Sequence, residues 1–213
     1  MDFPSGGVAL AVLAALGVLG IGRAIVLGLQ GILVIPVDRE RRPQEIVADV
    51  VFVVSFLLWL YEVVAAAWPL DAHLAPRFLL GTVVDSAPVR VVGAVVMVTG
   101  LVIYGLALQA FGPSWRFTID REHAGELVTG GIFARTRNPI YLGLSLLAFG
   151  SSLLLGRPIL LVLTLVFVVY FAHLTRREEA FLREHYGEPY RDYCRRVGRV
   201  WRFRAPPPGV SGS

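Results

Sequence analysis

Two polar stretches carry the residues best suited to chemistry, and the first is ARTRNPIYLG, residues 134–143. Asn138 and Pro139 predict a helix start, because asparagine caps free backbone amides and proline needs no amide hydrogen bond at the first helical position. Arg137 therefore stands at the positive end of the predicted helix, where its guanidinium and the unpaired amides can bind an anion. The alternative for a single arginine here is an anchor in the lipid headgroups.

The second stretch contains the adjacent Glu178 and Glu179, four to five residues beyond an apolar run that ends at residue 174. They are expected at nearly the same membrane depth as Arg137, so the two stretches together predict a site with both signs of charge. Such a site suits a zwitterionic, cationic ligand. A simple surface pair between Glu179 and Arg183 is the alternative, because these residues have the favourable order on a helix.

The elements that position these residues are predicted to be transmembrane helices. Of the 213 residues, 55% are apolar and 17% are charged, which is typical of a membrane protein rather than a soluble domain. Apolar runs that can cross or enter a bilayer occupy residues 8–35, 47–67, 88–110, 139–156 and 158–174. The last two runs are shorter and almost contiguous, which predicts a tight helical hairpin. The fold class is therefore an all-α integral membrane bundle of about five transmembrane helices with a cytoplasmic C-terminal helical segment.

The distribution of charge predicts the orientation. All 20 basic residues are arginines, and if the five spans alternate, only Arg77, Arg90 and Arg157 fall in loops on one side. Because positive loops stay in the cytoplasm, we expect a multi-pass protein with its N-terminus outside and its arginine-rich C-terminus inside. The leading MDFPSGG has no basic residue, so the first run is expected to be a retained helix rather than a cleaved signal.

Composition also narrows the classes of function. A chain without lysine excludes a Walker A lysine and a lysine Schiff base, and a single cysteine excludes an internal disulfide framework. The net charge of +4 is concentrated in the C-terminal tail, where anionic lipid is a simpler partner than nucleic acid. His173 and His185 lack the spacing of a metal site, and no obligate protein partner is evident from the sequence.

The chain is predicted to divide into three regions. Residues 1–110 form three transmembrane helices, residues 111–203 form the half that binds a cofactor and performs catalysis, and residues 204–213 form a flexible tail. Within the second region, polar residues 111–138 and 175–203 lie on the same side of the membrane and bracket the hairpin. The hairpin should therefore bring them together. The latter stretch is expected to form two short helices with a joint at Gly187 and Pro189.

Several residues inside the spans also invite interpretation. Gly143 and Gly150 are seven residues apart and share one helix face, where a neighbouring helix or a flat ligand can approach closely. Arg23 and Glu62 are ionisable groups at membrane depth, which suggests a functional or pairing role. Their different predicted depths make a direct pair between them doubtful, so each is expected to have another partner or to reach the interface.

The two polar stretches together resemble a known family. GELVTGGIFARTRNPIYLG, followed by a hairpin and REEAFLREHYGEPYRDYCRRVGRVWR, is similar to the C-terminal half of the isoprenylcysteine carboxyl methyltransferases and their bacterial relatives. The shared pattern is Leu-Val-Thr-x-Gly, Arg-(His or Asn)-Pro-x-Tyr-x-Gly, two glutamates, (Phe or Tyr)-Gly-x-x-Tyr and Tyr-x-x-x-Val. The resemblance covers roughly residues 111–202.

The resemblance implies that S-adenosylmethionine is the methyl donor and that the acceptor is a lipophilic or lipidated molecule entering from the bilayer. Arg137 and Glu179 match the positions expected to be catalytic. The residues implied to bind the cofactor are Leu127, Val128, Thr129, Arg137, Asn138, Pro139, Tyr141, Gly143, Glu178, Glu179 and Tyr193. The family often has histidine where this chain has Asn138, which disfavours an acid–base role at this position.

Other functions stay open at this point. Related folds methylate phospholipid amines, and a thiol or another carboxylate could equally be the acceptor. Sterol reductases that use NADPH end with a similar hairpin and a similar YCRRV tail, but they are much longer and the adjacent glutamates favour the transferase. A non-catalytic membrane scaffold that binds anionic lipid is the alternative outside enzymes. It has no need for two glutamates opposite the Arg-Asn-Pro turn.

Overall fold

The computed structural model of the protein describes residues 4–30, 42–68, 81–82, 86–112 and 127–200. Its helices are α1 (Ser5–Leu29), α2 (Pro43–Ala67), α4 (Ala87–Phe111), the short 3-10 helix η2 (Gly131–Ala134), α5 (Pro139–Leu155), α6 (Pro158–Tyr186) and α7 (Glu188–Arg196). No strand occurs in these residues. The all-α membrane fold expected from the sequence is confirmed.

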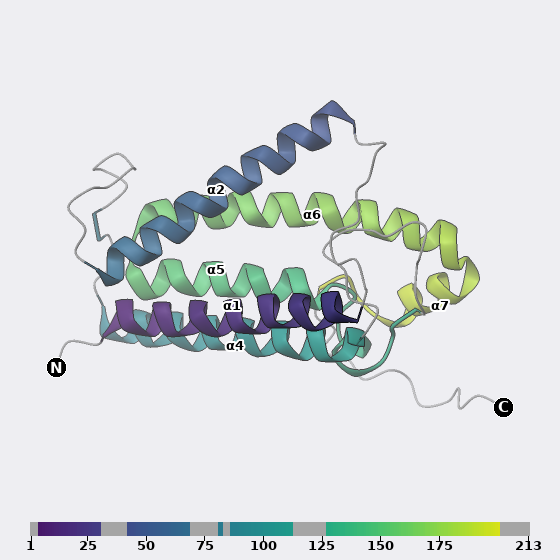
Figure 1. The fold of residues 1–213 in the computed structure, drawn as a ribbon, viewed down its shortest axis with the longest axis horizontal. Helices are drawn as coiled ribbons and strands as arrows, with labels where there is room; N and C mark the ends of the chain where they lie inside the picture. The colour runs from purple at the N-terminus through teal and green to yellow at the C-terminus, as the bar shows by residue number, and fades with distance from the viewer. Residues whose placement is uncertain (1–3, 31–41, 69–80, 83–85, 113–126, 201–213) are drawn as a thin grey trace.

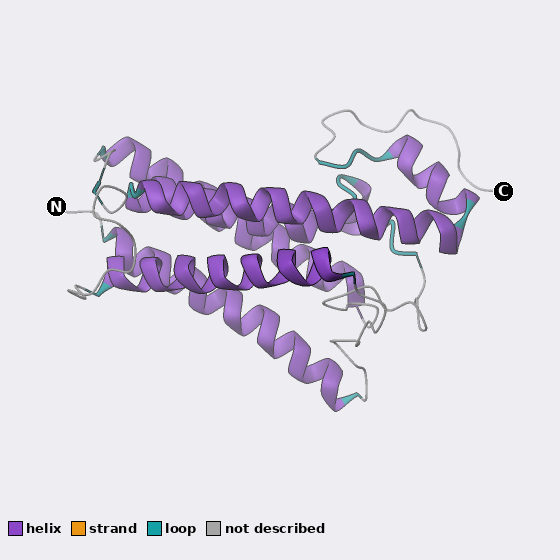
Figure 2. Ribbon diagram, turned by 90° about the horizontal axis from the view of Figure 1, so that it is seen from above, coloured by secondary structure: helices purple, strands orange, loops and turns teal. Residues whose placement is uncertain are grey.

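The long helices run alternately up and down in one bundle (Figure 1). Four of them, α1, α2, α4 and α6, are long and apolar enough to cross a membrane, whereas α5 has 17 residues. This is at the short end of the range that spans a bilayer. The ends of α1, α4 and α6 and the starts of α2 and α5 lie at one end of the bundle, beside α7 (Figures 1 and 2). Both polar stretches therefore reach the same end.

Close packing of α4 against α5 fixes the hairpin in the bundle. A Cβ atom on Gly100 would lie 2.6 Å from the carbonyl oxygen of Gly143, and one on Gly143 would lie 2.8 Å from the carbonyl oxygen of Gly100. Gly93 and Gly150 make the same kind of approach farther along the helices. The small-residue face predicted on α5 thus contacts a helix that carries matching glycines, as is common between membrane helices.

At the end of the bundle opposite α7, a buried ion pair joins the hairpin to α2. Glu62 is fully buried, and its Oε2 lies 3.2 Å from a terminal guanidinium nitrogen of Arg157 in the turn between α5 and α6. The same nitrogen donates to the backbone oxygen of Glu62 over 3.3 Å. Among the described residues, Glu62 thus pairs with Arg157 and not with Arg23, in line with the expected difference in depth.

The helix α2 leans away from the rest of the bundle towards the end that carries α7 (Figures 1 and 2). Its contacts there are with α6: Glu45 pairs with Arg177 over 3.0 Å, and Asp49 accepts a hydrogen bond of 2.7 Å from Tyr170. Phe52 stacks on the Tyr170 ring with centroids 4.2 Å apart. These contacts join the start of α2 to the C-terminal half of α6.

The polar end of the hairpin differs from the expectation in one respect. We expected the stretch after the fifth span to form two short helices, but the first of them is a continuation of α6, which extends unbroken to Tyr186. The joint is where it was predicted, at Gly187, whose φ of +60° suits glycine. The carboxylates of Glu178 and Glu179 are therefore carried on a rigid extension of a transmembrane helix.

Candidate active site

Arg137 occupies the predicted position directly before α5 and is held there from two directions. Its backbone amide donates to the carbonyl oxygen of Gly198 over 3.1 Å. Its side chain is 11% exposed, and one terminal nitrogen lies 3.2 Å from Glu179 Oε1. The Nε atom is buried and has no hydrogen-bond partner among the described residues. A buried donor without a partner costs free energy. A ligand oxygen that accepts a hydrogen bond from this Nε atom would remove that cost, which favours binding of the ligand.

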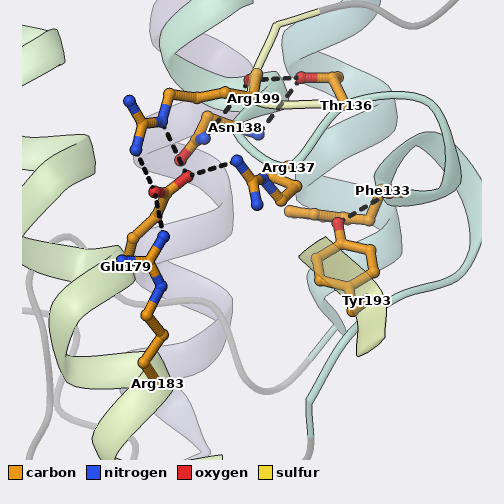
Figure 3. Close-up of polar contacts among 8 residues, drawn as sticks. All are labelled: Phe133, Thr136, Arg137, Asn138, Glu179, Arg183, Tyr193 and Arg199. Carbon is orange, nitrogen blue, oxygen red and sulfur yellow. Dashed lines mark hydrogen bonds and ion pairs between the residues drawn. The ribbon is translucent and has the colours of Figure 1, made fainter. Parts of the chain in front are cut away.

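Glu179 is the centre of an arginine cluster, which we define as Arg137, Arg183 and Arg199 around this carboxylate (Figure 3). The glutamate is only 2% exposed. Arg199 binds both of its oxygens, at 3.1 and 2.5 Å, and Arg183 lies 3.5 Å from Oε2. The hydrogen bonds and charge of Glu179 raise the pKa of Arg199. One carboxylate surrounded by three guanidinium groups leaves the cluster net positive.

The C-terminal strap, residues 197–199, returns from α7 to cover the start of α5. Val197 is buried, and the carbonyl oxygen of Arg199 accepts hydrogen bonds from Thr136 Oγ1 at 3.2 Å and from Asn138 Nδ2 at 3.5 Å (Figure 3). The Asn138 side chain makes no capping hydrogen bond to α5. Its predicted capping role is therefore wrong, because its amide binds the strap instead, while Pro139 begins the helix as expected.

Tyr193 and Leu127 hold the strap through a hydrogen bond to η2 and through apolar packing. The Tyr193 hydroxyl donates to the carbonyl oxygen of Phe133 in η2 over 2.7 Å (Figure 3). Burial raises the pKa of Tyr193, so the phenol keeps its proton for this hydrogen bond. Leu127 packs against the buried cluster of Tyr190, Tyr193 and Val197. These residues hold the strap and η2 together. Val128 and Thr129 are partly buried and connect Leu127 to η2.

A cavity of about 300 Å³ lies beside Arg137, between α2, α4, α5 and α6. We call it the aromatic cavity, since half of its lining residues have aromatic rings. The lining comprises Phe52, Tyr104, Phe111, Phe133, Arg137, Asn138, Pro139, Ile140, Tyr141, Leu144, Tyr170, Phe171, Leu174 and Glu178. An apolar cavity with a few convergent polar groups is typical of a small-molecule site.

Glu178 and Tyr141 provide a polar edge to the aromatic cavity. The Tyr141 hydroxyl donates to Glu178 Oε1, and the Tyr141 ring stacks on Phe171 with centroids 5.2 Å apart and an angle of 20° between the planes. None of the ion pairs among the described residues includes Glu178. The neighbouring Arg177 pairs with Glu45 on α2. The carboxylate of Glu178 is thus held in place by Tyr141 and forms no ion pair with a described residue.

The structure brings most of the sequence-predicted residues to one end of the bundle but sorts them into different surroundings. Arg137, Asn138, Pro139, Tyr141 and Glu178 line the aromatic cavity. Glu179 lies behind Arg137, and Gly143 faces the backbone of α4 instead of the cavity.

Two contributions were missed at the sequence level. Arg199 is one of many arginines in the tail, and no spacing distinguishes it from its neighbours. Phe52 of α2 and Tyr104 of α4 also line the aromatic cavity. In the sequence they are indistinguishable from the other apolar residues of their predicted spans. The aromatic cavity consequently draws on residues outside 111–203, although the division of the chain into three regions stays a prediction.

Comparison with known proteins gives consistent results. The family model described as phospholipid methyltransferase matches residues 89–189. A probable protein-S-isoprenylcysteine O-methyltransferase of Oryza sativa subsp. indica is 31% identical over 146 residues, which is 67% of this chain and 76% of the relative. The protein-S-isoprenylcysteine O-methyltransferase of Schizosaccharomyces pombe is 35% identical over 79 residues, covering 37% of this chain and 33% of the relative.

A solved structure, that of the eukaryotic intramembrane Ras methyltransferase (isoprenylcysteine carboxyl methyltransferase), is similar in fold. The TM-score is 0.55 at 21% sequence identity, and the match covers 95% of this chain and 69% of the solved one. At this identity the likeness concerns the fold alone. The similarity in fold extends over nearly the whole chain.

Proposed function

Because this chain belongs to the isoprenylcysteine carboxyl methyltransferase family and is a multi-pass membrane methyltransferase, we propose that it uses S-adenosylmethionine to methylate the carboxylate of a lipophilic acceptor. An isoprenylated cysteine is the acceptor that the names of the relatives favour. The NADPH-dependent reductase and the non-catalytic scaffold are accordingly set aside.

The observation that carries this proposal is the position of Arg137 between Glu179 and the aromatic cavity. Its buried Nε has no partner among the described residues, and Glu178 lies on the same cavity. A donor with a flat adenine ring, a carboxylate and a sulfonium needs apolar walls and both signs of charge. The residues of the cavity fit these requirements.

Each group then has a distinct task. Arg137 would bind a carboxylate, while Glu179 holds the guanidinium in place through its ion pair. When bound, S-adenosylmethionine supplies an activated methyl group that needs no metal. The acceptor carboxylate is already ionised at neutral pH, so the absence of a histidine at Asn138 removes no required base. The protein contributes mainly alignment of the two reactants and exclusion of water.

The lean of α2 supports entry of the acceptor from the lipid. Phe52 of α2 and Tyr170 and Phe171 of α6 belong to the lining of the aromatic cavity, and exposed apolar residues such as Val50, Val53 and Val54 cover the outer surface of α2. We therefore expect the apolar chain of the acceptor to reach the cavity from the bilayer beside α2. The bundle end that carries the site is proposed to face the cytoplasm, where the arginine-rich loops should lie.

Phospholipid N-methylation is the second candidate function, because the family model that matches residues 89–189 is described as phospholipid methyltransferase. Its acceptor would be a headgroup amine rather than a carboxylate. In thiol S-methylation the acceptor would be a sulfur atom. The three reactions therefore differ in the acceptor group and share the methyl donor.

The experiment that tests the proposal incubates the purified protein with methyl-labelled S-adenosylmethionine and separate pools of prenylated cysteine, phospholipid and small thiols. We expect label in a base-labile ester of the prenylated cysteine. Arg137→Ala and Glu179→Ala should abolish labelling, whereas Glu184→Gln, an exposed change on the same helix, should retain it. Label only in a headgroup amine would favour the second candidate, and unchanged donor affinity in both alanine variants would contradict the proposed site.

A further inference from the structure

Arg23 is a cation at membrane depth, and the described part of the protein gives it no counter-charge. It lies on α1, six residues before Leu29 and therefore about 9 Å from the end of the helix. Its Nε atom is buried without a hydrogen-bond partner. None of the ion pairs among the described residues includes it. An ionisable group inside a span usually marks a ligand or a partner, so Arg23 is a candidate binding residue for an anion.

The helices around α1 explain why Arg23 lacks a carboxylate. It packs against α2, α4 and α5, and α1, α4 and α5 contain no acidic residue. The helix α2 has three, but all of them are bound by α6 or by the turn before it. Figure 1 shows α2 diverging from α1 towards the end that carries α7, which takes Glu45 and Asp49 to the side of α6. Among the described residues of these helices, no carboxylate is left to neutralise Arg23.

Tyr104 of α4 is a second polar group at nearly the same depth. It lies seven residues before Phe111, about 10 Å from the end of its helix, and it is a buried residue of the cavity lining. The other two tyrosines of this lining, Tyr141 and Tyr170, donate to carboxylates. No described residue accepts a hydrogen bond from Tyr104. Because buried hydroxyl groups usually have a partner, a ligand oxygen would complete this one.

The packing of α1 against α4 brings the two groups together. A Cβ atom on Gly20 would lie 2.9 Å from the hydroxyl oxygen of Tyr104. Arg23 follows Gly20 by three residues, and residues at this spacing are neighbours on a helix surface. Leu27, one turn farther on, packs with Tyr104 in one buried cluster, so Arg23 lies on the side of α1 that faces α4. Helical side chains lean towards the N-terminus, which from Arg23 is the direction of Gly20 and the Tyr104 hydroxyl.

The chemistry of these two groups indicates what they can bind. A guanidinium group only donates hydrogen bonds, and its planar fork matches the oxygens of a carboxylate or a phosphate. The phenolic hydroxyl can donate to the same oxyanion. A free ion would have to leave water to reach this depth, which is costly, whereas an oxyanion attached to an apolar chain can be carried there. The exposed Ile21 and Ile25 beside Arg23 on α1 suit contact with such a chain.

We propose that Arg23 and Tyr104 bind the oxyanion of a membrane-embedded lipid, a carboxylate or a phosphate, on the α1 side of the aromatic cavity. This inference rests on the proposed function, because the lipid is the methyl acceptor. Its oxyanion is the reacting carboxylate of a prenylated cysteine or, in the second candidate function, the headgroup phosphate of a phospholipid. In both cases the two residues orient the acceptor, and the groups around Arg137 stay available to the donor.

The test compares ligand pairs that share their apolar chains and differ in the oxyanion. The first pair is a farnesylated N-acetylcysteine and its carboxamide, and the second is phosphatidic acid and diacylglycerol. Calorimetric titration would use the full-length protein in maltoside micelles, which contain no phosphate, and no methyl donor. The wild type should bind at least one oxyanion roughly tenfold more tightly than its neutral counterpart, as expected for one charge-assisted contact.

Substitution of each donor should remove this preference and spare binding of the chain. Arg23→Gln should reduce the preference to less than about threefold and leave the neutral ligands unaffected. Tyr104→Phe keeps the ring in the cavity lining and should lose a smaller part of it. The matched control is Arg176→Gln, which removes the same charge from an exposed position on α6 and should change nothing. If a thermal melt shows that Arg23→Gln is unfolded, Arg23→Lys, which keeps the charge without the fork, and Tyr104→Phe decide.

A steric variant tests the same site without removing either donor. In Gly20→Ala the new Cβ would lie 2.9 Å from the Tyr104 hydroxyl oxygen, so the hydroxyl must move, and oxyanion binding should weaken severalfold. Gly17→Ala is the control on the same helix, because nothing lies within 4 Å of its Cβ position.

The outcomes separate the source of the oxyanion from the existence of the site. Loss of the carboxylate preference in Arg23→Gln assigns the site to the prenylated cysteine, and loss of the phosphate preference assigns it to a phospholipid. A wild type without any preference, a preference that survives Arg23→Gln, or an equal loss in Arg176→Gln would each overturn the inference. These titrations contain no methyl donor. A wild type that binds an oxyanion through Arg23 but transfers no methyl label would therefore contradict the proposed function alone.

Discussion

Glu178 and Glu179 are consecutive residues of α6, yet their carboxylates lie in opposite electrostatic surroundings. Glu179 is enclosed by the arginine cluster, whereas Glu178 accepts a hydrogen bond from Tyr141 at the edge of the aromatic cavity. Successive residues on a helix are rotated by about 100°, so adjacent carboxylates must face different neighbours. Glu179 therefore holds guanidinium groups behind Arg137, whereas Glu178 lies on the lining of the aromatic cavity.

Arg199 should be required for tight binding of the methyl donor, although it lies in the tail. Because it binds both oxygens of Glu179, Arg199→Ala should weaken S-adenosylmethionine binding roughly three- to tenfold by loosening Glu179 and hence Arg137. Arg199→Lys keeps the charge without the two-pronged contact and should lie between. The control is Arg195→Ala, which removes an exposed arginine of α7. Equal effects of the Arg199 and Arg195 substitutions would argue for a general charge effect.

The glycine contact between α4 and α5 should be intolerant of a methyl group. In Gly100→Ala the new Cβ would lie 2.6 Å from the Gly143 carbonyl oxygen, so the helices must separate, and the free energy of unfolding should fall by about 1–3 kcal/mol. Gly22→Ala on α1 is the matched change, because nothing lies within 4 Å of its Cβ position. Unfolding in mixed detergent micelles would measure both. A loss of similar size in Gly22→Ala would point to helix flexibility instead of packing.

Breaking the Glu62–Arg157 pair from one side should destabilise the protein more than replacing both partners. Glu62→Leu leaves the Arg157 guanidinium without its buried carboxylate, and Arg157→Leu leaves a fully buried glutamate. Each single change should lower the free energy of unfolding by roughly 2–4 kcal/mol, and the double change should cost less than the sum of the two. Strict additivity would show that the pair contributes no coupling energy.

The site should open to the cytoplasm. The start of α4 and the end of α6 lie at opposite ends of the bundle (Figures 1 and 2). Single cysteines at Gly81, shortly before α4, and at Glu184, near the end of α6, in a Cys194→Ser background therefore report on the two ends, and both positions are exposed. A membrane-impermeant maleimide added to intact cells should label Gly81→Cys only, and permeabilisation should then allow labelling of Glu184→Cys. The reverse pattern would contradict the positive-inside prediction of the orientation.

The positions of most helices, and of the residues next to their ends, could be predicted from the sequence. Apolar runs predicted the spans because a bilayer demands long stretches without charge. Proline at the first helical position predicted the start of α5, and glycine predicted the joint at residue 187. The positions of Arg137 and Tyr141 at this end of the bundle were predictable for the same reason, because a helix start fixes what precedes it and what lies in its first turn.

The contacts that define the site chemistry were out of reach of such reasoning. The side chain of Asn138 donates to the carbonyl oxygen of Arg199 instead of capping α5. Gly143 packs against the backbone of α4 instead of lining the cavity. Both outcomes depend on segments that are distant in sequence. No local pattern states which of several carbonyl oxygens or helix faces will arrive at a given residue.

The sequence by itself determined that the chain crosses the membrane, that a hairpin joins its two polar stretches, and that arginine and glutamate meet at one end of it. These features follow from local properties, since hydropathy, proline and glycine act over a few residues. Only the tertiary structure decided which glutamate the arginines enclose and which one remains on the cavity. That choice depends on the rotation of α6 about its axis, which is set by packing against α2 and α5 and by the return of the strap over Arg137.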